Sequence, residues 1–453
     1  MDYDVIVIGS GAAGEGAAYL GRELGARVAV VERERELVGG ECAFWACMPS
    51  KTLLTAAARR AAGGDYSWER ASRRRDWMIS REEVAYPSDA DHVAGLEGAG
   101  AVVVRGEARI VGRGRVEVEA AARGRQLLEG SHVIVATGSV PVVPPLDGLR
   151  EAGYWTSREG TSLRDLPSSI VVLGGGVVGV EMAQVYARFG VATTIVEGGG
   201  RILSRDHPKS SEAVTEQLRR EGVVIRTGVK AKAVRAGGPG RIVELSDGSR
   251  VEGAQLLVAV GRRGSDLRAL GIEAAGVRLG ARGDVQPDEQ MRVADGLFVA
   301  GDAAGGLQFT HLADYEGKIA VRAALGQKVR ADLAAVPKAT FTDPEVGAVG
   351  LTVEEARAHG IDAFEVSQDF AATARGLSLE ANGGHLTLVV DRGRRILAGA
   401  FMAFPGATEL VHETALAIKL RVPIDVLADT MHAFPTGARA LGSLFEDAAK
   451  QLA

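Results

Sequence analysis

Cysteine is scarce in this 453-residue chain, which contains only Cys42 and Cys47. Aromatic residues make up 5%, and neither charge sign dominates: 53 Lys and Arg oppose 58 Asp and Glu, for a net charge of −5. This balance gives no reason to expect a nucleic-acid partner, and no long basic run indicates a membrane surface. No apolar run approaches the ~18 residues of a spanning helix. The N-terminus enters a strand without a signal-peptide pattern, so we expect a cytoplasmic protein.

The two cysteines lie five positions apart, which indicates a redox couple; two unrelated buried thiols are the alternative. An undistorted α-helix would separate their Cα atoms by about 8.6 Å, whereas a disulfide tolerates at most ~6.8 Å. We therefore expect Cys42 at or before a helix start and Cys47 inside the helix, with Gly39-Gly40 forming a tight entry. In a cytoplasmic protein such a pair is more often catalytic than structural.

A βαβ dinucleotide fingerprint opens the chain. An apolar strand at 4–8 precedes Gly9, Gly11 and Gly14, a helical stretch runs to about residue 25, and a second strand ends at Glu32. Glycines let the backbone approach a pyrophosphate at the helix N-terminus, and an acid at this spacing can accept a ribose hydroxyl. A simple glycine turn between strand and helix is the alternative.

The fingerprint repeats later in the chain. A strand at 170–173 precedes Gly174, Gly176 and Gly179, and the next strand ends at Glu197, again 23 residues after the first glycine. The duplication predicts two dinucleotide sites. Glu197 would repel a 2′-phosphate and so favours NAD over NADP, although Arg201 nearby makes that preference moderate.

The remaining segments complete an α/β fold. We expect polar helices over 52–100, with Arg73-Arg74-Arg75 on a solvated face, and a small antiparallel sheet over 101–134, including Val102-Val103-Val104. Strands at 133–135, 256–260 and 297–300 end in small residues, the last before Gly301-Asp302. The predicted architecture is two doubly wound, Rossmann-like dinucleotide-binding domains and a C-terminal α+β domain.

Together these motifs resemble the FAD-dependent pyridine nucleotide–disulfide oxidoreductases, the family of dihydrolipoamide dehydrogenase, glutathione reductase and mercuric reductase. The resemblance rests on both fingerprints, Cys42 to Lys51, 136–139, Gly301-Asp302 and the C-terminal motifs at 341–345 and 349–352. It covers essentially the whole chain. It implies an FAD domain at 1–150 and 275–330, an NAD(P) domain at 151–274, and a dimerisation domain at 337–453 that makes a homodimer.

The resemblance also implies roles for individual residues. Cys47 is the thiol against the flavin, Cys42 is the interchange thiol, and Lys51 lies near flavin N5, paired with Glu181. These four form the expected catalytic set. The residues expected to bind FAD are Gly9, Gly11, Ala13, Gly14, Glu32, Glu41, Lys51, Ala108, Thr137, Gly138, Arg262, Gly301, Asp302 and Thr310. Those expected to bind NADH, or less readily NADPH, are Gly174, Gly176, Val178, Gly179, Glu181, Glu197 and Gly261.

The implied chemistry passes electrons from nicotinamide to flavin to the Cys42–Cys47 disulfide, or backwards from a dithiol. Thiol–disulfide members also carry a C-terminal His-Pro with a glutamate five residues after the histidine. Here Phe434 and Arg439 occupy those positions, and phenylalanine cannot transfer a proton. His432 either compensates or is structural, and a structural role is expected.

The linker between the cysteines also departs from the family pattern. Phe44 replaces the usual Asn and Ala46 the usual Gly; Phe44-Trp45 forms either an apolar lip or core packing.

These departures lead us to expect an NADH-dependent enzyme with a small acceptor: an activated disulfide, a quinone or a metal ion. Mercuric reductase shares the Phe-Pro pattern, but its C-terminal cysteine pair has no counterpart, so efficient mercury reduction is not expected. No protein metal site is predicted. Two alternatives remain: an ordinary dihydrolipoamide dehydrogenase, and a slow flavoprotein sensor of the NADH/NAD ratio.

Overall fold

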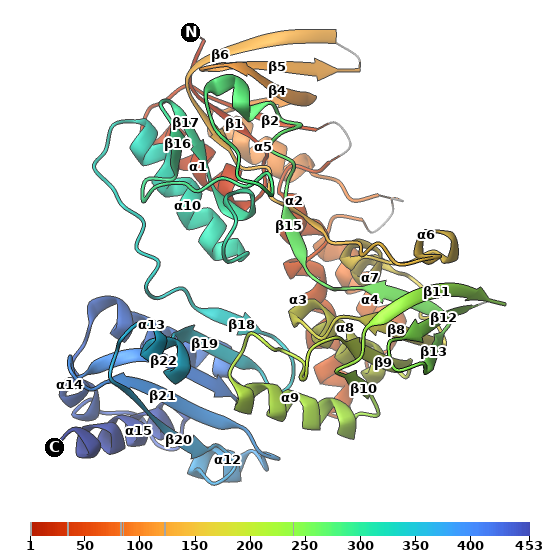
Figure 1. The fold of residues 1–453 in the computed structure, drawn as a ribbon, viewed down its shortest axis with the longest axis vertical. Helices are drawn as coiled ribbons and strands as arrows, with labels where there is room; N and C mark the ends of the chain where they lie inside the picture. Colours follow the sequence, from red (N-terminus) through yellow and green to blue (C-terminus); the bar gives the residue numbers. More distant parts are fainter. Residues whose placement is uncertain (1, 34–35, 82–83, 85, 122–123, 239) are drawn as a thin grey trace.

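Three main sheets and their covering helices build the molecule (Figure 1). The computed structural model describes residues 2–33, 36–81, 84, 86–121, 124–238 and 240–453. The predicted fold class, two doubly wound sheets followed by a C-terminal α+β unit, is confirmed. Within the described residues, no helix is long and apolar enough to span a membrane.

The first sheet has the order β16-β17-β6-β1-β2-β3, parallel from β17 to β3. Its central strand β1 is buried from Val5 to Ile8, because a parallel strand of this kind is covered on both faces. The prediction that Val102–Val104 belongs to an antiparallel sheet is wrong, because the helical crossover after β2 returns this segment parallel to β2. The strands are β1 (Tyr3–Ile8), β2 (Val28–Glu32), β3 (Val102–Arg105), β6 (Gly124–Val135), β16 (Arg292–Ala294) and β17 (Leu297–Val299).

An antiparallel meander joins this sheet, because β6 continues beyond it to pair with β5, which pairs with β4. These strands are β4 (Glu107–Gly112) and β5 (Arg115–Ala120). The meander matches the antiparallel part of the prediction for residues 101–134.

Helices cover the first sheet, whereas the helix that begins at Cys47 packs against helix α8 (Val177–Arg188) of the second sheet. The expectation of helices over 52–100 is confirmed, but Arg75 is not on a solvated face. Its side chain is fully buried and donates to the carbonyls of Thr161 and Leu163 and to Asp76, which compensates its charge. Burial lowers the pKa of Arg75 to about 10. The helices are α1 (Ala12–Glu23), α2 (Gly40–Phe44), α3 (Cys47–Ala61), α4 (Trp68–Met78), α5 (Ala90–Gly98), α10 (Thr310–Ala324) and the 3₁₀ turns η1 (Ile272–Ala275) and η2 (Gly301–Ala304).

The second sheet repeats the parallel βαβ plan in the order β10-β9-β8-β14. A three-stranded antiparallel sheet and a two-stranded ribbon flank it. Its strands are β8 (Ser169–Leu173), β9 (Ala192–Glu197), β10 (Val224–Thr227) and β14 (Gln255–Val258); the flanking strands are β7 (Ser139–Pro141), β11 (Ala231–Gly237), β12 (Gly240–Leu245), β13 (Arg250–Gly253) and β15 (Arg262–Gly264). The helices are α6 (Leu149–Ala152), α7 (Ser157–Ser162), α8 (Val177–Arg188) and α9 (Pro208–Arg220).

The third sheet is antiparallel, in the order β18-β19-β22-β21-β20. Its strands are β18 (Lys338–Thr340), β19 (Val346–Gly350), β20 (Ala363–Asp369), β21 (His385–Asp391) and β22 (Ile396–Ala403). Its helices are α11 (Val353–Ala358), α12 (Ala374–Ser378), α13 (Ala407–Leu420), α14 (Ile424–Ala428) and α15 (Gly437–Leu452).

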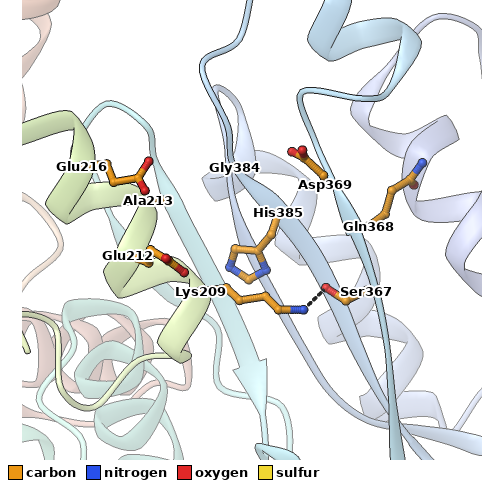
Figure 2. A pocket seen from close by; sticks show the side chains of 9 residues that line it. All are labelled: Lys209, Glu212, Ala213, Glu216, Ser367, Gln368, Asp369, Gly384 and His385. Carbon is orange, nitrogen blue, oxygen red and sulfur yellow. Dashed lines mark hydrogen bonds between the residues drawn. The ribbon is translucent and has the colours of Figure 1, made fainter. Parts of the chain in front are cut away.

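Helix α9 fastens the second sheet to the third. Lys209 donates to the Ser367 hydroxyl at 2.6 Å (Figure 2). The buried His385 shares a 2.8 Å hydrogen bond with Ser210. A small cavity of about 330 Å³ lies between these elements. The limits predicted for the three domains stay a prediction.

Candidate active site

The two glycine loops have the same backbone geometry. A Cβ on Gly14 would lie 2.0 Å from the Gly9 carbonyl oxygen, and one on Gly179 would lie 2.0 Å from that of Gly174. Each loop therefore packs its helix so closely on its strand that only glycine fits. A Cβ on Gly11 would meet nothing within 4 Å, so the loop leaves open space where a ligand can approach.

The acid after each second strand faces its own glycine loop. Glu32 Oε2 accepts the Ser10 backbone N–H at 2.8 Å, and Glu197 Oε2 accepts that of Gly175 at 2.7 Å. The Ser10 hydroxyl adds a 2.6 Å bond to Glu32. Both carboxylates are thus oriented beside the helix N-terminus, where the sequence predicted ribose contacts.

The cysteine segment is broken into two helices. Cys42 lies in α2, and Cys47 is the first residue of α3; the break is at Trp45 and Ala46. The expectation that Cys42 precedes the helix containing Cys47 is confirmed, but Cys42 also has a short helix of its own. Residues 39 and 40, both glycines, have φ of 109° and 68°, values that favour glycine, so the tight entry is confirmed.

The two thiols lie close together with different proton affinities. A hydrogen bond from Cys42 lowers the pKa of Cys47, and the Thr310 hydroxyl, 3.3 Å from its sulfur, lowers it further. The Lys51 charge acts in the same direction on that pKa. The same sulfur–sulfur hydrogen bond and burial raise the pKa of Cys42. These opposite shifts favour ionisation of Cys47 over Cys42 in the reduced pair.

An ion pair lies next to the thiols. Lys51 Nζ is 2.7 Å from Glu181 Oε2, and the Glu181 side chain is only 3% exposed. The second oxygen of Glu181 accepts the Phe341 backbone N–H at 2.9 Å. A buried carboxylate needs such partners, and here both oxygens have one.

One large cavity of about 1120 Å³ contacts both thiols and the first glycine loop. Its volume is above the ~300–1,000 Å³ of most small-molecule sites, as a large cofactor requires. Gly14 does not line it, because it packs against the strand side of its helix. Of the residues expected to bind FAD, those that line it are Gly9, Gly11, Ala13, Glu32, Glu41, Lys51, Ala108, Thr137, Gly138, Arg262, Gly301, Asp302 and Thr310.

Hydrogen bonds to neighbouring side chains orient the polar groups of the cavity wall. Ser139 donates to Asp302 at 2.5 Å and accepts from Arg262 at 2.8 Å. Glu41 accepts through one oxygen from Arg158, and its other oxygen is buried without a hydrogen-bond partner among the described residues, with Arg262 Nη1 3.6 Å away. An orphaned polar atom in a cavity of this size calls for a ligand. The open glycine loop and this set of polar groups fit an FAD-sized dinucleotide.

The glycines of the second loop lie outside this cavity. Of the residues expected to bind the nicotinamide nucleotide, Val178 and Glu181 line the cavity, through helix α8. The others are Gly174, Gly176, Gly179, Glu197 and Gly261, and they do not line it. Helix α8 therefore connects the second loop to the thiol centre.

The C-terminal segment has no histidine in the expected base position. Phe434 is 74% exposed, and Arg439 donates to Ser443 and Glu446. The His432 side chain is buried, and its Nε2 lies 2.8 Å from Glu413 Oε1. A structural role for His432 stays a prediction.

Phe44 and Trp45 pack in the core. They are 2% and 6% exposed and contact His92 and Tyr86, respectively. Core packing is therefore the correct interpretation of this pair, although Trp45 also reaches the cavity wall.

Helix α7 supplies contacts that the sequence did not reveal. Thr161 donates to the carbonyl of Trp45, between the two cysteines, at 3.0 Å, and Arg158 bonds both Glu41 and Glu36. The capping box at residues 156 and 159 could have indicated the helix, but not its partners.

Comparison with protein families agrees with this geometry. The model of the pyridine nucleotide-disulphide oxidoreductases matches residues 3–317, and that of their dimerisation domain matches residues 336–444. The chain belongs to this family of FAD-dependent oxidoreductases, which use a pyridine nucleotide. The dimerisation domain supports a homodimer.

Individual relatives span the whole chain. A mercuric reductase of Streptomyces lividans is 34% identical, over 97% of this chain and 94% of that protein. A dihydrolipoyl dehydrogenase of Chlorobaculum parvum is also 34% identical, over 96% and 94%. Among solved structures, a Cu(II) complex of the HOCl-induced flavoprotein disulfide reductase RclA from Escherichia coli has a TM-score of 0.88 at 27% identity, covering 98% of this chain and 99% of that one.

Proposed function

We propose that this protein is an NADH-dependent reductase that passes electrons through FAD and the Cys42–Cys47 pair to a small acceptor. The observation that carries this proposal is the cavity in which both thiols, Lys51 and the first glycine loop meet. When bound there, FAD would accept hydride from nicotinamide and deliver two electrons to the disulfide.

Cys42 and Cys47 have different roles in the reaction. Two electrons and one proton convert the disulfide to a Cys42 thiol and a Cys47 thiolate, an assignment that the opposite directions of their pKa shifts support. Cys42 then serves as the interchange thiol. With a disulfide acceptor, the net reaction is NADH + H⁺ + RSSR → NAD⁺ + 2 RSH.

The second loop supports NADH as the donor. Glu197 stands at the ribose position, oriented by the Gly175 N–H. The Arg201 guanidinium donates to three backbone carbonyls, at residues 203, 204 and 206. It is thus committed to its own loop and is a poor candidate for binding a 2′-phosphate.

The missing base supports an acceptor that needs little proton transfer at Cys42: an activated disulfide, a quinone or a metal ion. Phe434 cannot transfer a proton, a role worth about 10²–10⁴ in rate. A metal ion as acceptor is supported by the similar proteins, which include a mercuric reductase and a Cu(II) complex of RclA. Dihydrolipoamide dehydrogenase is the second candidate, favoured by a relative of equal identity.

An acceptor screen tests the proposal. Steady-state NADH oxidation by the flavin-loaded protein is measured with lipoamide, glutathione disulfide, a naphthoquinone, Cu(II) and Hg(II). We expect faster turnover with a quinone, a metal ion or an activated disulfide than with lipoamide. Fast lipoamide turnover would favour the second candidate, and slow turnover with every acceptor would favour a redox sensor.

A further inference from the structure

The loop between β18 and β19 is fastened to helix α8 along one helical face. Glu181, Gln184 and Arg188 recur at helical spacing and all bond residues 341–343. Gln184 makes two 2.8 Å bonds with the Asp343 backbone, and Arg188 lies 2.7 Å from the Asp343 carboxylate. The third sheet therefore places this loop at the thiol centre.

Phe341 makes two separate contacts with the ion pair. Its backbone N–H donates to Glu181 at 2.9 Å, and its ring centroid lies 4.9 Å from Lys51 Nζ. Its side chain lines the same cavity as the thiols. The ammonium is thus bounded by a carboxylate and by an aromatic face, which attracts cations.

We propose that Phe341 is a positioning residue of the redox centre, which orients Glu181 through its backbone and holds the Lys51 ammonium through its ring. The inference deepens the proposed function and rests on it, because it gives Lys51 a role beside the bound flavin. A loose ammonium would spend less time at the thiols and the cofactor, and its electrostatic effect there would weaken.

The test removes the ring and keeps the backbone donor. In flavin-loaded Phe341→Leu and Phe341→Met, we expect the rate of flavin reduction by NADH to fall about two- to thirty-fold, the range of a cation–π contact. We also expect the acid limb of Cys47 alkylation to move to higher pH, because the positive charge of Lys51 lowers the pKa of Cys47. Phe341→Tyr keeps the aromatic face and should restore both values. Thermal unfolding of each variant reports its fold.

A double-mutant cycle separates positioning from packing. In a Lys51→Met background, Phe341→Leu should cause no further change in either readout, since the ring acts through the ammonium. Additive losses, or a Phe341→Leu enzyme equal to wild type, would overturn the inference while leaving the proposed function intact. A wild-type protein that binds flavin but is not reduced by NADH would overturn both.

Discussion

The two glycine loops of this molecule share a backbone but differ in their surroundings. In each loop, a Cβ added to the third glycine of the fingerprint would lie 2.0 Å from a carbonyl oxygen. In each, an acid also accepts a hydrogen bond from the backbone N–H of the residue after the first glycine. The first loop lines a cavity of about 1120 Å³ to which the cysteine segment, Asp302 and Thr310 also contribute. The glycines of the second loop lie outside it, and only Val177 and Val178 of that loop reach it. A fingerprint thus specifies dinucleotide binding, while the surrounding segments determine whether the ligand is enclosed.

The largest expected effect comes from adding one methyl group to each loop. Gly14→Ala should weaken FAD binding by about 10- to 100-fold, because its Cβ meets the Gly9 carbonyl. Gly179→Ala should retain the flavin and weaken NADH binding by a similar factor. Flavin absorbance of the purified proteins and the KM for NADH measure these effects. Loss of flavin in both variants would contradict the division of roles.

A second variant tests the C-terminal position at which the base is missing. Phe434→His introduces a proton-transferring group at the position where thiol–disulfide members carry one, and we expect up to about 10²-fold faster disulfide reduction. Turnover with glutathione disulfide and lipoamide measures it, with quinone turnover as the control. No gain would show that the missing base does not limit this enzyme.

We expect a smaller effect from replacing the acid that follows the second strand of each βαβ unit. Glu197→Gln should raise the KM for NADH about ten-fold and improve NADPH relative to NADH, because a charged acceptor is lost. Glu32→Gln should instead weaken flavin retention. Steady-state kinetics with both nucleotides and flavin release on dilution measure the pair. Equal kcat/KM for NADH and NADPH in the wild type would contradict the argument from Glu197.

The smallest effect concerns the thiols. The lowered pKa of Cys47 keeps it a thiolate above that pKa, and its reactivity is lost as the pH falls through it. Thr310→Val removes the hydroxyl 3.3 Å from the sulfur, so the acid limb of iodoacetamide alkylation should move up by about one pH unit. An unchanged profile would remove Thr310 from the account of Cys47.

Local features were readable from the sequence because their physical causes are local. Apolar strands, glycine loops and strand-end acids recur at fixed spacing, so both βαβ units were predicted, as was the tight entry at Gly39 and Gly40. Burial was harder to read. The arginine-rich neighbourhood of Arg75 predicted a solvated side chain. Inside the protein, however, its guanidinium donates hydrogen bonds to the carbonyls of Thr161 and Leu163, which lie more than 80 positions away.

The repeated dinucleotide fingerprints and the close spacing of the two cysteines can be read from the residues alone, because the hydrophobic period and the steric need for glycine act over a few residues. The groups that surround the thiols, by contrast, come from segments that the folded chain brings together. Thr310 lies 263 positions from Cys47. Glu181 lies 130 positions from Lys51, and its pairing with that lysine was expected only from the resemblance to a known family. Such contacts depend on how crossovers and domains pack, and no spacing along the chain encodes them.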